Sequence, residues 1–159
     1  MPAVTVRVST GLDPDEAFDR IRQFERYPEL TTAVQEVCLE PAAADGSVLS
    51  RWTVHFRNGL LRWTERDSFL PDTRTVVFEQ VRGDFSVFTG SWRVVGTPGG
   101  SEVTFDSAFD LGIPTLAAIL DPVAISALRT DILLILRGLL GDVVERSFDP
   151  DEAGVGGRT

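Results

Sequence analysis

Residues 121–146 read DPVAISALRTDILLILRGLLGDVVER, and this stretch decides the fold. Its apolar side chains recur at the 3.6-residue spacing of an amphipathic helix, and further leucines and valines widen the apolar stripe to most of the circumference. Asp121 is a suitable N-cap, and Pro122 suits the first helical position. Charged side chains within the stretch exclude a transmembrane span. The stretch therefore predicts one long helix whose apolar surface other elements must cover.

The segments before this helix alternate apolar and polar residues as antiparallel strands do. We predict strands over residues 3–9, 34–40, 48–70 (a hairpin), 75–81, 85–95 and 102–111. After the first strand, Asp13, Pro14 and Glu16 form the signature of a capped helix start, and a short helical turn is expected over 30–33. The predicted fold class is α+β, with a curved antiparallel sheet of about six or seven strands around the long helix and an apolar cavity between them.

The dipeptide Asn58-Gly59 marks the turn of the hairpin, because it favours a two-residue type I′ turn. That turn would place Ser50 opposite Asp67 and Trp52 opposite Glu65. Side chains alternate between the two faces of a strand, so the register also sorts them into an inner and an outer face. The predicted inner face carries Trp52, Val54, Phe56, Leu61, Trp63 and Phe69. Glu65 and Asp67 fall on this inner face as well, among aromatic side chains.

The bulk properties describe a single globular domain. The chain has 159 residues and a formal net charge of −9, with 24 acidic against 15 basic side chains. We expect the domain to span 1–148 and the tail over 149–159 to be disordered. The acidic balance disfavours a nucleic-acid partner. The single cysteine, Cys38, excludes an internal disulfide, and the N-terminus lacks the pattern of a signal peptide, so we expect a cytoplasmic protein. No zinc-binding or nucleotide-binding motif occurs, and we expect neither a metal nor a cofactor.

Glu65 and Asp67 are the candidate catalytic residues. A carboxyl group that is desolvated among aromatic rings should have a raised pKa, and repulsion between the two would raise one pKa further, which suits general acid and base chemistry. The alternative is that the strand end splays into solvent, or that the register shifts and exposes both side chains. His55, the single histidine, falls on the outer face, so a surface role is favoured over a catalytic one.

The candidate ligand-binding residues are polar and aromatic side chains expected to face the cavity. They are Tyr27, Trp52, Trp63, Phe78, Gln80, Phe88, Trp92, Ser107 and Phe109. The rings could stack on a flat ligand or could be ordinary core packing, and Ser107 could donate a hydrogen bond to a ligand carbonyl. Gln80 is included because the expected register of its strand places it opposite Glu65. Thr130 and Asp131 on the last helix either face the cavity or lie along its solvent edge.

Several short motifs resemble those of a known family. They are FERYPEL at 24–30, LP at 70–71 with RTV at 74–76, GDF at 83–85 followed by WRV at 92–94, and GSEVTF at 100–105. With these motifs the chain resembles, over about residues 3–146, the START-like helix-grip superfamily (SRPBCC). The resemblance is to its polyketide cyclase/dehydrase branch, which includes aromatase/cyclases and coenzyme Q-binding proteins.

The resemblance implies a helix-grip fold and a hydrophobic or aromatic small-molecule ligand. It implies an aromatase/cyclase that binds a poly-β-ketone or aromatic polyketide intermediate and promotes cyclisation or dehydration, with the acyl carrier protein of a polyketide synthase as a partner. The alternative is a non-catalytic carrier or sensor of a quinone or lipid. The cyclases carry an arginine on the strand after the first hairpin, whereas here the matching inner positions are Trp63, Glu65, Asp67 and Phe69, and Arg66 faces outward. Sheet edges and the apolar last helix would permit a homodimer.

Overall fold

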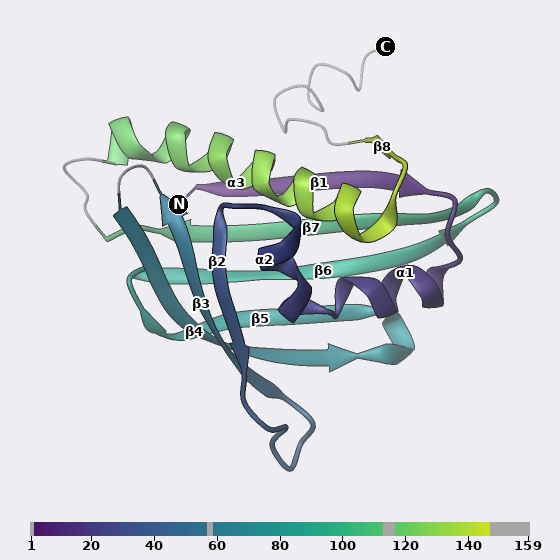
Figure 1. Ribbon diagram of the computed structural model, residues 1–159, viewed down its shortest axis with the longest axis horizontal. Helices are drawn as coiled ribbons and strands as arrows, with labels where there is room; N and C mark the ends of the chain where they lie inside the picture. The colour runs from purple at the N-terminus through teal and green to yellow at the C-terminus, as the bar shows by residue number, and fades with distance from the viewer. Residues whose placement is uncertain (1, 57–58, 113–116, 147–159) are drawn as a thin grey trace.

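One antiparallel sheet forms the body of the protein (Figure 1). The computed structural model describes residues 2–56, 59–112 and 117–146, so the tail expected over 149–159 lies outside the described residues. The strands follow the order β2-β3-β4-β5-β6-β7-β1-β8 across the sheet. They are β1 (Ala3–Thr10), β2 (Val34–Leu39), β3 (Val48–Phe56), β4 (Gly59–Leu70), β5 (Thr75–Gly83), β6 (Val87–Thr97), β7 (Gly100–Asp110) and β8 (Val143–Glu145). The α+β class is confirmed, and the described sheet has eight strands where about six or seven were expected.

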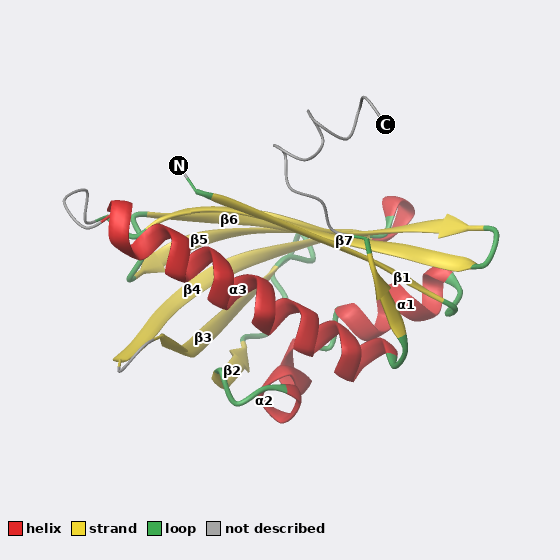
Figure 2. Cartoon of the chain, turned by 90° about the horizontal axis from the view of Figure 1, so that it is seen from above, coloured by secondary structure: helices red, strands yellow, loops and turns green. Residues whose placement is uncertain are grey.

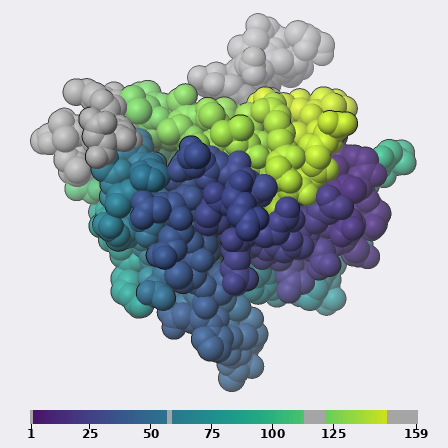
Figure 3. All heavy atoms as spheres, viewed as in Figure 1, coloured from purple at the N-terminus to yellow at the C-terminus, as the bar shows by residue number. Residues whose placement is uncertain are grey.

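The helices lie on one side of the sheet (Figure 2). They are α1 (Pro14–Ile21), α2 (Tyr27–Leu30) and α3 (Ala117–Leu140). α3 packs on β1, and α1 packs on β6, β7 and α3. The first part of the chain, through α1, α2 and β2, lies against α3 over the face shown in Figure 3. The predicted arrangement of a sheet around one long helix is therefore confirmed, and the apolar core lies between these two layers.

α1 begins as the sequence predicts. The Asp13 side chain accepts a hydrogen bond from the backbone N–H of Asp15, and Pro14 occupies the first turn. The expected short helix over 30–33 is wrong in position, because α2 spans Tyr27–Leu30. Pro28 lies in the first turn of α2, where no intrahelical N–H bond is required, so the proline does not prevent a helix at this position.

The last helix differs from the prediction at both ends. α3 begins at Ala117, so Asp121 is not its N-cap and Pro122 lies inside the helix. The run AAIL at 117–120 contains the good helix formers Ala and Leu, and the helix continues through Pro122 with the loss of one backbone hydrogen bond. At the other end Gly141 has a φ of +81°, a left-handed conformation that ends a helix. The chain then turns back as β8, whose Val143 pairs with Thr10 of β1.

The predicted hairpin register between β3 and β4 is wrong by two residues. Phe56 lies opposite Gly59, and Trp52 lies opposite Trp63 rather than Glu65. The two indole rings are stacked with an interplanar angle of 1° and a centroid distance of 5.9 Å. An aromatic pair contributes about 0.5–1.5 kcal/mol beyond its burial, which favours this register over the one set by Asn-Gly. Because the shift is an even number, the predicted division into inner and outer faces still holds.

The predicted register between β4 and β5 is confirmed. Glu65 lies opposite Gln80, Asp67 opposite Phe78 and Leu70 opposite Thr75. The connecting residues Pro71–Thr73 form a short 3-10 turn, and Arg74 follows with a φ of +48°. This turn brings β5 directly beside the carboxyl groups of β4, and β5 contributes Phe78 to their surroundings.

Candidate active site

Two adjoining hollows lie between α3 and the inner face of the sheet. One, here called the tyrosine lobe, has a volume of about 80 Å³ and is lined by Tyr27, Trp52, Glu65 and Phe78, among others. The other, here called the hairpin lobe, measures about 70 Å³ and lies beside the tip of the β3–β4 hairpin. The lobes share wall residues, namely Val54, Trp63, Phe88, Leu128 and Asp131. An apolar cavity with a few polar groups is the usual form of a small-molecule site.

Most of the predicted binding residues line this cavity. Those on the tyrosine lobe are Tyr27, Trp52, Trp63, Phe78, Phe88 and Trp92. Phe109 lines the hairpin lobe. Gln80 and Ser107 are not among the lining residues of either lobe. The structure therefore brings the aromatic candidates together and separates the two polar ones from them.

The side chains of Gln80 and Ser107 have other surroundings. Gln80 donates from Nε2 to the Phe85 carbonyl at 2.8 Å and accepts from the Phe85 N–H at Oε1, so its amide holds the segment between β5 and β6. Ser107 is buried, and its hydroxyl has no hydrogen-bond partner among the described residues. The correct backbone register placed Gln80 opposite Glu65, but it did not reveal where the amide would point.

Several lining residues were not among the candidates. On the tyrosine lobe they are Phe24, Val34, Val54, Phe105, Leu128, Ile132 and Ile135. The strand alternation and helix spacing that predict buried positions could have identified most of them, because a residue on an inner face can line a cavity as well as fill a core. For Asp131 the sequence left two positions open, the cavity or its solvent edge, since a carboxyl group on a helix is usually solvated.

Glu65 and Asp67 are buried side by side on the inner face of β4. Their exposed fractions are 4% and 0%, so the alternative of a strand end open to solvent does not hold. Glu65 lines the tyrosine lobe, whereas Asp67 lines neither lobe. Of the predicted pair, only Glu65 can therefore contact a ligand in the cavity, and Asp67 lies behind it.

A chain of hydrogen bonds holds the carboxyl pair. Trp63 Nε1 donates to Glu65 Oε1 at 2.8 Å. The Ser50 hydroxyl donates to Asp67 Oδ2 at 2.5 Å, and Trp52 Nε1 donates to that hydroxyl oxygen at 2.8 Å. Buried carboxyl groups need such donors, because desolvation without a hydrogen bond is costly. The two indole groups thus orient both acids.

The two carboxyl groups are placed so that they can share a proton. Burial raises the pKa of Glu65 well above its usual value, and a hydrogen bond from its protonated form to Asp67 and the Asp67 charge raise it further. Burial also raises the pKa of Asp67, while the hydrogen bonds from Glu65 and Ser50 oppose that rise. Asp67 Oδ1 has no N–H or hydroxyl donor among the described residues, so a protonated Glu65 is the group that can satisfy it. Of the two carboxyl groups, Glu65 is therefore the one that holds a proton more tightly.

Tyr27 faces the pair but does not offer it a proton. Its hydroxyl donates to the Ile21 carbonyl at 2.7 Å within a fully buried site. Burial, followed by the charges of Glu65 and Asp67, raises the pKa of Tyr27 well above 10. Tyr27 therefore stays neutral and contributes its ring to the cavity wall.

Asp131 is the other carboxyl group on the cavity wall. It lines both lobes and also an open groove on the outer side of α3. Burial raises its pKa to about 6. His55, for which a surface role is favoured over a catalytic one, is exposed and borders the hairpin lobe but not the tyrosine lobe. Thr130 is exposed beside the outer groove, so of the two open helix candidates Asp131 is the one that faces the cavity.

Within the described residues no group of three or more histidine, cysteine, aspartate or glutamate side chains could hold a metal ion. None of the helices in the described part of the chain is long and apolar enough to cross a membrane.

Comparison with known proteins places the fold. Residues 10–131 match the family described as polyketide cyclase / dehydrase and lipid transport. No curated protein matches the chain in sequence. A protein of Thermus thermophilus superimposes with a TM-score of 0.77 at 19% identity, covering 87% of this chain and 94% of that one. A START superfamily protein of Mycobacterium smegmatis gives 0.74 at 16% identity, covering 88% and 97%. The Zhui aromatase/cyclase of a Streptomyces species, R1128, gives 0.68 at 14% identity, covering 87% and 90%. These similarities show the helix-grip fold.

Proposed function

Because the chain belongs to the polyketide cyclase / dehydrase and lipid transport family, we propose that it binds a poly-β-ketone or aromatic polyketide intermediate and promotes its cyclisation or dehydration. The observation that carries this proposal is Glu65, a buried acid on the wall of an aromatic cavity with a second carboxyl group behind it. Perturbed carboxyl groups in a cavity are typical of acid and base catalysis.

The shared proton suits a reaction that moves protons to and from carbon. When Glu65 accepts a proton from the carbon next to a ligand carbonyl, its own proton can pass to Asp67, whose Oδ1 has no permanent donor. The electron pair of the broken C–H bond forms an enolate. In aldol closure this enolate attacks a second carbonyl, and the pair returns its proton to the new alkoxide. No external oxidant or reductant is required.

Dehydration uses the same groups in the same order. The pair takes the proton from carbon, the C–H electrons form the new double bond, and the neighbouring C–O bond breaks. The pair then supplies its extra proton to the departing hydroxide, which leaves as water. Glu65 is therefore proposed as the catalytic residue, and Asp67 acts through it as a positioning residue and proton acceptor.

The aromatic walls would orient the substrate. The rings of Trp63, Phe88 and Phe78 line the lobe that Glu65 borders. Stacking against such rings restricts a flexible polyketone to few conformations, and orientation alone accounts for a large part of many rate enhancements. The missing inner arginine of the cyclases means that Glu65 and Asp67 would perform the proton transfers here.

The test is the product profile of a poly-β-ketone-producing synthase with and without this protein. Wild type should redirect the products, whereas Glu65→Gln and Asp67→Asn should do so weakly or not at all. Glu65→Gln should still fold, because its amide N–H can replace the carboxyl proton as a donor to Asp67. Glu79→Gln is the matched control, since Glu79 is exposed on the outer face of β5. Unchanged redirection by Glu65→Gln would exclude acid and base catalysis and leave templating by the cavity.

A carrier is the second candidate, and one observation favours it. The polar atoms of three cavity aromatics are bound within the protein: Tyr27 to a carbonyl, Trp52 to Ser50 and Trp63 to Glu65. Their rings therefore present apolar surface to a ligand, which suits a quinone or another ring compound that is only carried. A carrier would retain its affinity for the ligand in Glu65→Gln and would change no product profile.

A further inference from the structure

The cavity has an unusual charge pattern. Its acidic lining residues are Glu65 from β4 and Asp131 from α3, and the buried Tyr27 stays neutral. Neither lobe has an arginine or lysine among the described lining residues, and the exposed His55 is the basic side chain at the hairpin lobe. A ligand that enters with a negative charge would therefore find no buried cation to pair with.

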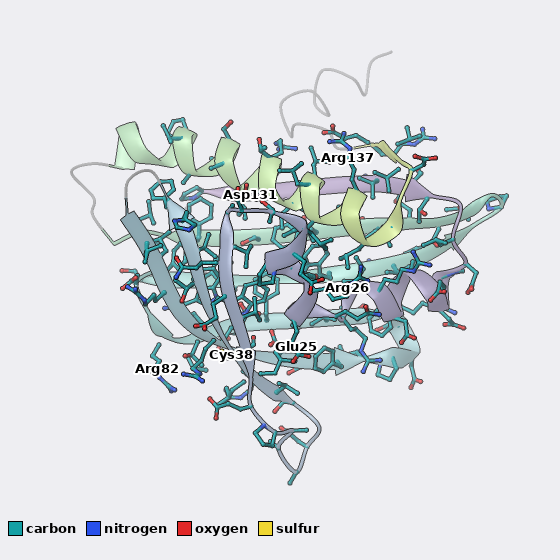
Figure 4. The ribbon with its side chains drawn as sticks, in the orientation of Figure 1. Glu25, Arg26, Cys38, Arg82, Asp131 and Arg137 are labelled. Carbon is teal, nitrogen blue, oxygen red and sulfur yellow. The ribbon has the colours of Figure 1, made fainter. Side chains whose placement is uncertain are left out.

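Asp131 lies where the two lobes and the outer groove meet. Figure 4 shows it on the side of α3 that faces the start of β2. It borders both lobes and the outer groove, so it stands where the cavity approaches the surface. Unlike Glu65, it makes no hydrogen bond or ion pair with any described residue. Its oxygens are therefore available to a ligand.

We infer that Asp131 determines ligand specificity: the cavity admits neutral ring compounds that carry a hydroxyl group and rejects ring compounds that carry a carboxylate. The inference rests on the proposed function, because it concerns the ligand of the same cavity. A phenolic hydroxyl can donate to the Asp131 carboxylate, and such a charge-assisted bond is about twice as strong as a neutral one. A carboxylate would lose its hydration, face the negative charges of Asp131 and of the Glu65–Asp67 pair, and gain no cation in return.

The sizes of the lobes indicate which probes to use. The lobes measure about 80 and 70 Å³ and are lined in part by the same residues, so the probes are small ring compounds that differ only in their polar group. Naphthalene, 2-naphthol and 2-naphthoate have the same ring system and differ only in the polar group. At neutral pH 2-naphthol is uncharged and 2-naphthoate is an anion.

The experiment measures dissociation constants of the three probes by calorimetry at neutral pH. Wild type should bind 2-naphthol at least about tenfold more tightly than 2-naphthoate, which corresponds to about 1.4 kcal/mol. In Asp131→Asn this ratio should fall severalfold, while naphthalene binds as in wild type. Asp142→Asn is the matched control, because Asp142 is exposed just after α3 and its loss changes the net charge equally.

The outcomes distinguish the role of Asp131 from ligand binding in the cavity. A wild-type ratio near one, or a ratio that Asp131→Asn leaves unchanged, overturns the role of Asp131 and leaves the cavity as a binding site. A ratio that falls equally in Asp142→Asn shows a general charge effect and overturns the inference as well. Failure of all three probes to bind overturns ligand binding in this cavity, and the inference with it.

Discussion

Trp52 and Trp63 face each other across β3 and β4 with their rings parallel, and the indole N–H groups reach the two ends of one buried acid network. Trp63 donates to Glu65, and Trp52 reaches Asp67 through the Ser50 hydroxyl. The same ring pair therefore sets the strand register and orients the acids. Four predictions test this arrangement and its surroundings.

Trp63→Phe should destabilise the protein more than Trp92→Phe. Both changes remove an indole from the tyrosine lobe, but only Trp63 donates to a buried carboxyl group, while the Trp92 N–H has no partner among the described residues. Leaving a buried acceptor without its donor costs about 1–3 kcal/mol. Denaturant unfolding of the two variants measures the difference. Equal losses would show that the hydrogen bond contributes no stability beyond ring packing.

Glu65 should remain protonated at neutral pH. Burial first, and then its hydrogen bond to Asp67 and the Asp67 charge, hold its pKa well above the usual range. Infrared spectra should therefore contain a protonated carboxyl band at neutral pH that is absent from Glu65→Gln. The Trp63 hydrogen bond lowers the pKa of Glu65. In Trp63→Phe the protonated carboxyl band should therefore persist to a higher pH than in wild type. A spectrum without the band in wild type contradicts the shared proton.

Asp131 should make stability fall as the pH rises from about 4 to about 6. Its pKa is about 6 in the folded protein and 3.8 in the absence of burial, so the folded state holds the proton more tightly. The stabilisation is complete below the lower value and is lost as the pH passes the higher one. The groups facing Asp131 across the cavity, Glu65 and His55, are unchanged in Asp131→Asn. Unfolding free energies of wild type and this variant should therefore converge toward acid pH, and wild type should lose stability relative to the variant as the pH rises. A constant difference over this range would contradict the raised pKa.

Gly90→Ala should be more damaging than Gly99→Ala. A Cβ atom at Gly90 would collide with the Asp106 carbonyl of β7 and with the Phe78 ring, whereas at Gly99 it would meet nothing. Overpacking of this kind costs about 1–3 kcal/mol, and it would also displace Phe78 from the cavity wall. Thermal unfolding measures the stability of both variants. Equal melting temperatures would mean that β6 and β7 can separate freely at this point.

Local features of the sequence predicted most of the fold. The capped start of α1 and the register of β4 on β5 follow from nearby residues, and the structure confirms both. The burial of Glu65 and Asp67 could be predicted because it depends only on which face of β4 they occupy. These features need no knowledge of distant parts of the chain.

Long-range contacts explain what the sequence did not predict. β8 forms by pairing with β1, from the other end of the chain, so helical spacing through Val143 and Val144 was misleading. Asp67 is separated from the cavity by its neighbours, and the amide of Gln80 bonds to the backbone of Phe85 instead of lining the cavity. Such outcomes depend on side-chain packing, which alternation and turn preferences do not describe.

A shift of the β3–β4 pairing by two residues and a shift by one residue have different evolutionary consequences. The observed pairing differs by two residues from the one that Asn58-Gly59 favours, and both pairings bury Glu65 and Asp67. A slip of one residue would instead turn both acids outward and expose Trp63. Mutations in the hairpin tip that shift the β3–β4 pairing by two residues therefore keep both acids on the inner face and can accumulate. Mutations that shift the pairing by one residue turn the acids outward and are removed by selection.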